Sequence, residues 1–101
     1  MTTSCKEIAI FKVSKTNFDR VMVLSENIFK EMNADEMVIT DYEIFQNVDK
    51  YDEICWLLTW KSLDAAKQTT KKWPNFPSTK ELESLVGDNL YYGHFDKVKL
   101  R

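Results

Sequence analysis

The sequence is poor in the residues on which many cofactor and metal sites depend. Its 101 residues include two glycines, two prolines, two cysteines and one histidine. Two glycines are too few for the G-x-G-x-x-G dinucleotide turn, and His94 follows Gly93 where a P-loop would need lysine. One histidine and two cysteines exclude multi-histidine and four-cysteine zinc sites within one chain. The sequence therefore predicts no haem, flavin or structural metal and no cofactor.

The two cysteines, Cys5 and Cys55, lie far apart in the sequence and form no C-x-x-C pair. This spacing predicts free thiols, which are typical of a cytoplasmic protein. The first seven residues contain no apolar segment of the kind that signal peptides carry. The longest apolar run, residues 54–58, is too short to span a bilayer, so no membrane partner is expected.

The charges are nearly balanced and slightly acidic. Fourteen basic and 16 acidic residues give a net charge of −2, with an isoelectric point near 5.4. Nucleic-acid-binding domains usually carry a basic face, and no aromatic-basic RNA-binding motif is visible, so nucleic acid is not an expected partner. The length and the 44% of hydrophobic residues predict a single domain over residues 1–101.

Segments of period 2 alternate with segments of period 3.6 along the chain. The patterns predict strands at 7–13, 37–47, 53–61 and 90–100, with amphipathic helices at 17–32 and 63–73. A short third helix is expected after residue 78. The order β-α-β-β-α-(short α)-β predicts an α+β, ferredoxin-like fold, a four-stranded antiparallel sheet with helices on one face.

Polar residues predict where the helices begin and end. Ser62 is a suitable N-cap for helix 63–73, which Pro74 cannot continue. Thr16 with Asp19, and the run 78–81 (Ser-Thr-Lys-Glu), resemble capping boxes. Gly87 is expected to end the short third helix.

Strands 7–13 and 53–61 are apolar on both faces. In the second of them, Trp56 and Trp60 belong to one alternating set, and Cys55 and Leu57 to the other. Two helices can cover only one face of a sheet, so the other would remain exposed. An exposed apolar patch usually marks an interface, which here predicts a homodimer through the sheet face.

The run 57–66 (Leu-Leu-Thr-Trp-Lys-Ser-Leu-Asp-Ala-Ala) ends a strand in Trp-x-Ser and opens a helix with an acidic residue and alanine. Together with the element order, this run resembles the antibiotic biosynthesis monooxygenase-like family of dimeric α/β barrels. The resemblance implies two ferredoxin-like protomers with their sheets packed together, and in each protomer a pocket between sheet and helices. The family includes cofactor-free oxygenases of aromatic compounds, haem-degrading enzymes and proteins without known activity.

The chain departs from two patterns of that family. Haem-degrading members carry an iron-binding histidine on the helix after the Trp-x-Ser element, and residues 63–73 here contain none. The strand asparagine of oxygenase members, four residues before the motif tryptophan, falls on Trp56.

Aromatic residues are the candidates for binding a planar substrate. The resemblance implies that Trp60 lines the pocket, and alternation places Trp56 on the same face. Trp73 is expected at the pocket mouth and Tyr92 on the last strand. For each of these residues the alternative is ordinary packing in the core or at a helix end.

His94 and Tyr42 are the candidate catalytic residues. In a cofactor-free oxygenase, a base removes a phenolic proton before the carbanion meets oxygen, and histidine or tyrosine can serve that role. The alternative for His94 is a half-exposed strand histidine. Two weaker candidates are a carboxylate pair, Asp41 with Glu43, and a nucleophile pair of Cys55 with His94.

Two functions remain open at this point. One is a monooxygenase-type enzyme that acts on a small aromatic or polycyclic compound without a cofactor. The other is a non-catalytic dimeric module that binds a lipophilic small molecule. The direction in which His94 and Tyr42 point, toward the helices or toward the opposite sheet face, bears on this choice.

Overall fold

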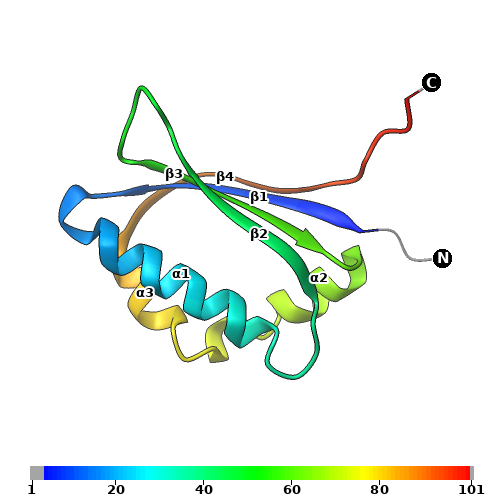
Figure 1. Ribbon diagram of the computed structural model, residues 1–101. Coiled ribbons are helices and arrows are strands. Elements are labelled where there is room, and N and C mark those ends of the chain that lie inside the picture. The colour runs from blue at the N-terminus through cyan, green and yellow to red at the C-terminus, as the bar shows by residue number, and fades with distance from the viewer. Residues whose placement is uncertain (1–3, 101) are drawn as a thin grey trace.

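A sheet covered by helices on one of its faces forms the protein (Figure 1). The computed structural model describes residues 4–100. The elements of this range are β1 (Cys5–Val13), η1 (Lys15–Asn17), α1 (Phe18–Met32), β2 (Ile39–Gln46), β3 (Glu53–Trp60), α2 (Leu63–Thr70), η2 (Trp73–Asn75), α3 (Thr79–Leu85) and β4 (Val86–Phe95), where η marks a 3-10 turn. The predicted α+β ferredoxin-like order, with its short extra helix, is confirmed.

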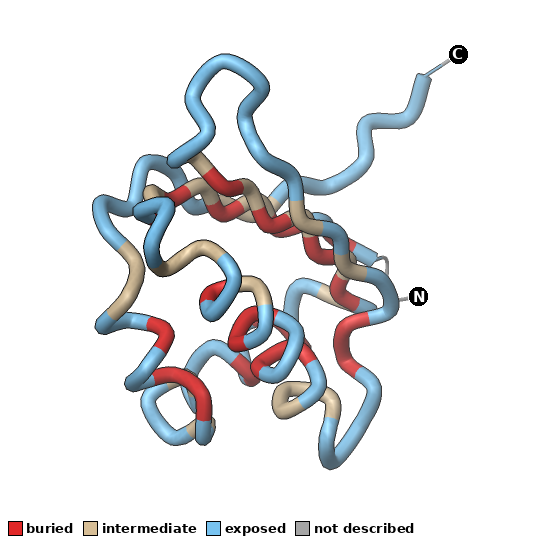
Figure 2. Tube along the Cα trace, turned by 60° about the vertical axis from the view of Figure 1, so that its left-hand side comes forward, coloured by how far each residue is buried: buried red, intermediate tan, exposed pale blue. Residues whose placement is uncertain are grey.

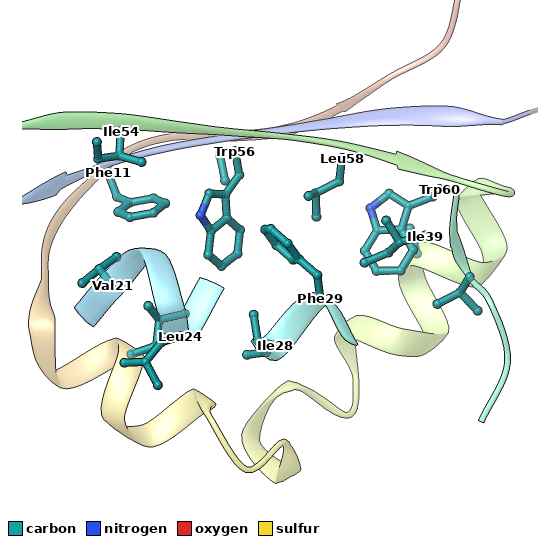
Figure 3. Packing of buried hydrophobic residues seen from close by; sticks show 14 of the residues in the cluster. Phe11, Val21, Leu24, Ile28, Phe29, Ile39, Ile54, Trp56, Leu58 and Trp60 are labelled. Carbon is teal, nitrogen blue, oxygen red and sulfur yellow. The ribbon is translucent and has the colours of Figure 1, made fainter. Parts of the chain in front are cut away.

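The strands are ordered β2-β3-β1-β4, and each adjacent pair is antiparallel. The central position predicted for β3 is confirmed, and β2 is an edge strand. Buried and partly exposed residues alternate along β1 and β3 (Figure 2). The buried side chains that Figure 3 labels on these strands point toward the helices. Over residues 4–100, the opposite face of the sheet carries no helix (Figure 1).

The core fills the space between the sheet and α1. Leu58 and Trp60 of β3 are at most 1% exposed, and Phe29 and Ile28 of α1 are completely buried. Phe29 extends from α1 toward β3 between Trp56 and Leu58 (Figure 3). Trp56 extends from the same strand, and its Nε1 donates to Ser25 Oγ over 3.2 Å. The alternation in β3 therefore places both of its indoles on the helix side of the sheet.

Ser62 and Ser78 hold the N-cap positions of α2 and α3 as predicted, but of the three predicted caps only Ser62 makes the side-chain bond. Ser62 Oγ accepts the backbone N–H of Ala65 over 3.0 Å. Ser78 makes no such bond to its own helix, because its Oγ donates to Glu31 of α1 over 2.5 Å. Thr16 lies inside η1, and Asn17 precedes α1 without a side-chain cap.

The end of α2 also differs from the prediction. The helix ends at Thr70 rather than at Trp73, which begins the turn η2. The N–H of Lys72 donates to the carbonyl of Thr69, three residues back, so the helix tightens to a 3-10 pattern there. Pro74, which has no N–H to donate to the carbonyl of Thr70, prevents the α pattern from resuming. This change of direction carries Trp73 back toward the sheet, where its ring centroid lies 6.5 Å from that of Trp56.

The last strand begins earlier and ends earlier than the predicted 90–100. Val86 already pairs with Val13 of β1, so Gly87 lies in β4 instead of ending the helix. At the other end the pairing stops at Lys6 with Phe95. Residues 96–100 project beyond β1 and have no strand partner within the described chain (Figure 1).

Candidate functional site

A cavity of about 330 Å³ lies between the sheet and the segment from α2 to α3. The indoles of Trp56 and Trp60 line it from β3, and Trp73 lines it from η2. Its other lining residues include Glu7, Ala9, Phe11, Leu82, Glu83 and Tyr92. The strand residues Trp56 and Trp60 are buried, whereas Glu83 and Tyr92 are exposed, so the cavity has an accessible rim and a floor that is apolar except for the buried Glu7.

The Trp-x-Ser element explains how the motif tryptophan reaches this cavity. Trp60 is the last residue of β3, and the alternation of that strand turns its ring toward the helices. Ser62 caps α2 immediately afterwards, so the chain turns back across the same sheet face. Trp60 is thus held between a strand end and a helix start.

The polar centre of the site is Glu7, whose residue surface is only 5% exposed. Three groups lie within hydrogen-bond distance of its Oε1: Trp60 Nε1 at 3.1 Å, His94 Nε2 at 3.0 Å and Tyr92 Oη at 3.4 Å. Glu7 pairs with His94 in the register of β1 and β4, and Ala9 pairs with Tyr92, so the three side chains share the helix face. Trp60 joins them from β3.

The low polarity around Glu7 changes its acidity. Burial raises the pKa of the Glu7 carboxyl, while the charge of His94 and the three hydrogen bonds oppose that shift. Burial and the nearby Glu7 carboxylate likewise raise the pKa of Tyr92. A carboxyl group with a raised pKa is a stronger base than an exposed one, which is what a general base needs near neutral pH.

The raised pKa of Glu7 predicts a pH dependence of stability. In the folded protein the Glu7 carboxyl binds a proton more tightly than in the unfolded chain, where its pKa is about 4.5. The stabilisation is therefore complete below pH 4.5 and is lost as the pH rises through the folded value. We expect the free energy of unfolding of the wild type to fall, relative to Glu7→Gln, over that range. Urea titrations of both proteins at several pH values measure this difference; a constant difference would contradict it.

The residues predicted from the sequence are only partly brought together. Trp56, Trp60, Trp73 and Tyr92 line one cavity. His94 points to the helix side of the sheet but lies behind Glu7, outside the cavity lining.

Tyr42 lies elsewhere. It also faces the helices, where its ring packs on Phe29 with the centroids 4.7 Å apart, but it borders a separate hollow beside α1. A joint action of His94 and Tyr42 at one substrate is therefore not supported by their positions.

The two weaker candidate pairs do not form a site. Asp41 and Glu43 are exposed on the edge strand β2. Cys55 pairs with Ile10 on the open face, whereas His94 lies on the helix face. Both cysteines are free, as their spacing predicts.

Glu7 is the functional residue that sequence reasoning missed. The signal was present, because Glu7 belongs to the alternating set that otherwise contains Cys5, Ala9, Phe11 and Val13. A glutamate in the inward set of a central strand is rarely buried without polar partners. Those partners come from distant parts of the chain.

Among residues 4–100, no three histidine, cysteine or acidic residues gather as a metal site would require. Within the same range, no helix combines the length and apolar character needed to cross a membrane.

The sequence matches no protein-family model and no curated protein. Solved structures do share its fold over nearly the whole chain. A conserved protein from Methanosarcina mazei Go1 has 17% identity and a TM-score of 0.74, over 96% of this chain and 95% of that one. A candidate antibiotic biosynthesis monooxygenase from Caulobacter crescentus CB15 has 14% identity and a TM-score of 0.74, over 97% of this chain and 92% of that one.

SnoaB from Streptomyces nogalater, a cofactor-independent oxygenase, is also similar. Its identity is 16% and its TM-score 0.74, over 97% of this chain and 96% of that one. The resemblance drawn from residues 57–66 and the element order is thus confirmed at the level of the fold.

Proposed function

We propose, from the fold shared with the antibiotic biosynthesis monooxygenase-like proteins, that this chain is a cofactor-independent monooxygenase-type enzyme. Its substrate is a small planar aromatic or polycyclic compound that stacks on Trp60 and Trp56, with Trp73 and Tyr92 beside it. One observation carries this proposal: a buried carboxylate, Glu7, in the wall of an aromatic cavity, with burial raising its pKa.

In the proposed reaction, Glu7 accepts the phenolic proton of the substrate. The negative charge of the phenolate is shared with its para carbon, which bonds to O₂ and forms a peroxide. The para hydrogen then moves as a proton to the distal peroxide oxygen while the O–O bond breaks, which leaves a carbonyl group and hydroxide. The proton held by Glu7 converts the hydroxide to water. A phenol and O₂ thus give a quinone and water, and no external reductant is needed.

The experiment that tests this function is oxygen uptake with 1-naphthol, whose para position is free. We expect consumption of O₂ with formation of 1,4-naphthoquinone, one for one, in the presence of chelator. Uptake that stops after removal of trace metal would contradict a cofactor-independent reaction.

A second candidate is a non-catalytic dimeric module that binds a lipophilic small molecule. The aromatic and aliphatic floor of the cavity favours it, because such a floor binds apolar rings without any chemistry. If 1-naphthol and other phenols bind but cause no oxygen uptake, the result would support the module over the enzyme.

His94 is expected to act through Glu7 as a positioning residue. Replacing His94 by alanine removes a hydrogen bond and a charge that both lower the pKa of Glu7. We expect turnover at neutral pH to fall about 10- to 100-fold, and the acid limb of the pH–rate profile to move to higher pH. His94→Gln keeps a hydrogen-bond donor and should recover part of the loss. An unchanged pH profile in His94→Ala would contradict this role.

We also propose that the chain is a homodimer through the open face of the sheet. That face carries Ile8, Ile10, Cys55 and Leu57 at its centre, and the half-exposed rings of Phe45, Tyr91 and Phe95 beside them. Burying this apolar surface against a second copy gives an interface of about 1,000 Å² or more.

The variant Leu57→Lys tests the dimer. It places an unpaired charge at the centre of the proposed interface, so we expect a monomer or aggregate in light scattering at micromolar concentration. Val23→Lys, on the exposed side of α1, is the matched control and should remain a dimer. A wild type that elutes only as an 11.9 kDa species would contradict the proposal.

A further inference from the structure

The side-chain hydrogen-bond donors of the cavity wall are already engaged within the protein. Trp56 donates to Ser25 Oγ over 3.2 Å, and Trp60 donates to Glu7 over 3.1 Å. Trp73 donates to Glu83 Oε2 over 3.0 Å. The three indoles therefore offer a ligand their ring faces and not their N–H groups.

The remaining donors of the wall are engaged in the same way. Tyr92 Oη lies 3.4 Å from Glu7 Oε1, and Thr70 Oγ1 donates to the carbonyl of Ala66 over 2.8 Å. With the oxygen and nitrogen of its amide exchanged, which is the orientation that its neighbours favour, Asn89 donates to the carbonyls of Ile10 and Tyr91 over 3.1 and 3.2 Å. A ligand that only accepts hydrogen bonds would have to displace one of these bonds.

Acceptors, in contrast, are available. Trp60, Tyr92 and His94 all lie within hydrogen-bond distance of Glu7 Oε1. Glu7 Oε2 has no hydrogen-bond partner among the described residues. The side chain of Glu7 is only 7% exposed, and it lines the cavity. Every fully enclosed side-chain N or O atom of the described residues has a hydrogen-bond partner, so this unpartnered Oε2 is reachable. Because Glu7 lines the cavity, we expect a ligand to reach Oε2 from there.

The charges of the cavity wall also favour an uncharged ligand. Its ionisable side chains are Glu7 on the floor, Glu83 on the rim and the phenol of Tyr92, and no lysine, arginine or histidine is among its described lining residues. An anionic ligand would meet two carboxylates in a poorly solvated space, and His94, the basic group beside Glu7, lies outside the lining and is bonded to Glu7 Oε1.

We propose that this cavity selects ligands that donate hydrogen bonds and carry no negative charge, with Glu7 Oε2 as the selecting atom. This inference rests on the proposed use of the cavity as the substrate site. It narrows the substrate class to uncharged planar phenols and excludes aromatic carboxylates. It also gives product release a cause, because a quinone has only acceptors where the phenol had a donor.

The experiment compares three ligands with the same ring in calorimetric titrations without oxygen, so that no turnover occurs. 1-Naphthol donates a hydrogen bond, 1-acetonaphthone only accepts, and 1-naphthoate is an anion. We expect 1-naphthol to bind about tenfold or more tightly than 1-acetonaphthone, with 1-naphthoate weakest. Equal affinities, or a preference for the anion, would overturn the proposal.

The variant Glu7→Gln inverts the prediction. Its amide oxygen must take the place of Oε1, which faces three donors, so its NH₂ group takes the place of Oε2 and presents a donor to the cavity. We expect 1-acetonaphthone to bind better than 1-naphthol in this variant. Glu43→Gln, on the exposed edge strand, loses the same charge and should keep the wild-type preference. A Glu7→Gln protein with the wild-type preference would also overturn the proposal.

The outcomes separate this inference from the proposed function. Selective binding of 1-naphthol without oxygen uptake would support the donor-selective cavity and contradict the oxygenase. Oxygen uptake together with equal affinities for the three ligands would support the oxygenase and contradict the donor-selective cavity. Failure of all three rings to bind would overturn both, since both need an open cavity.

Discussion

Replacing Glu7 by glutamine is expected to lower kcat by about 10²- to 10⁴-fold, because the amide cannot accept the phenolic proton. The fold should persist, since the amide oxygen can still accept from Trp60 and Tyr92. Oxygen uptake at saturating 1-naphthol measures kcat separately from the weaker binding expected in this variant. Glu43→Gln is the control for the loss of charge.

The pH–rate profile of the wild type gives an independent test of the same residue. A base must be ionised to act, so kcat should rise as the pH passes through the pKa of Glu7. Burial raises that pKa, which places the acid limb above the range of an exposed carboxyl. A Glu7→Gln protein with wild-type kcat, or a profile without this limb, would show that another group is the base.

Replacing Trp60 by alanine is expected to cost about 3–5 kcal/mol of the free energy of unfolding. The ring is 1% exposed, so its removal leaves a cavity in the core and takes a hydrogen bond from the buried Glu7 carboxylate. Domains of this size unfold with about 5–15 kcal/mol, so the variant would lose a large share of its stability. Urea titration measures the change.

Two further variants separate the parts of this effect. Trp60→Phe keeps much of the ring volume but not the N–H, so it should lose less stability than alanine. Trp73→Ala removes a half-buried indole from the cavity mouth and should lower the free energy of unfolding less than Trp60→Ala.

Stacked ligands should quench the tryptophan emission of the wild type, and this response should be absent in Trp60→Ala. A loss of less than about 1 kcal/mol in Trp60→Ala would contradict a core role.

The order of the elements and the direction of the indoles follow from short-range patterns in the sequence. Alternation in β3 is a local property, since each residue turns to the face opposite its neighbour, and Trp56 and Trp60 follow that rule. Ser62 caps α2 through a bond to Ala65, only three residues away. Such short-range features can be read from a run of residues without knowledge of the rest of the chain.

The partners of Glu7, in contrast, depend on contacts between segments that are distant in the sequence. His94 is 87 positions away, and no local pattern fixes the register that places the two side by side. The pairing of β1 with β4 shifts between Ile10 and Phe11, where Tyr91 and Asn89 are the successive partners. An extra residue at this point reverses the alternation, so Asn89 and Tyr92 face the same cavity although they are an odd number of positions apart. Because a bulge is fixed by the pairing of two strands, neither strand's own sequence could place these residues.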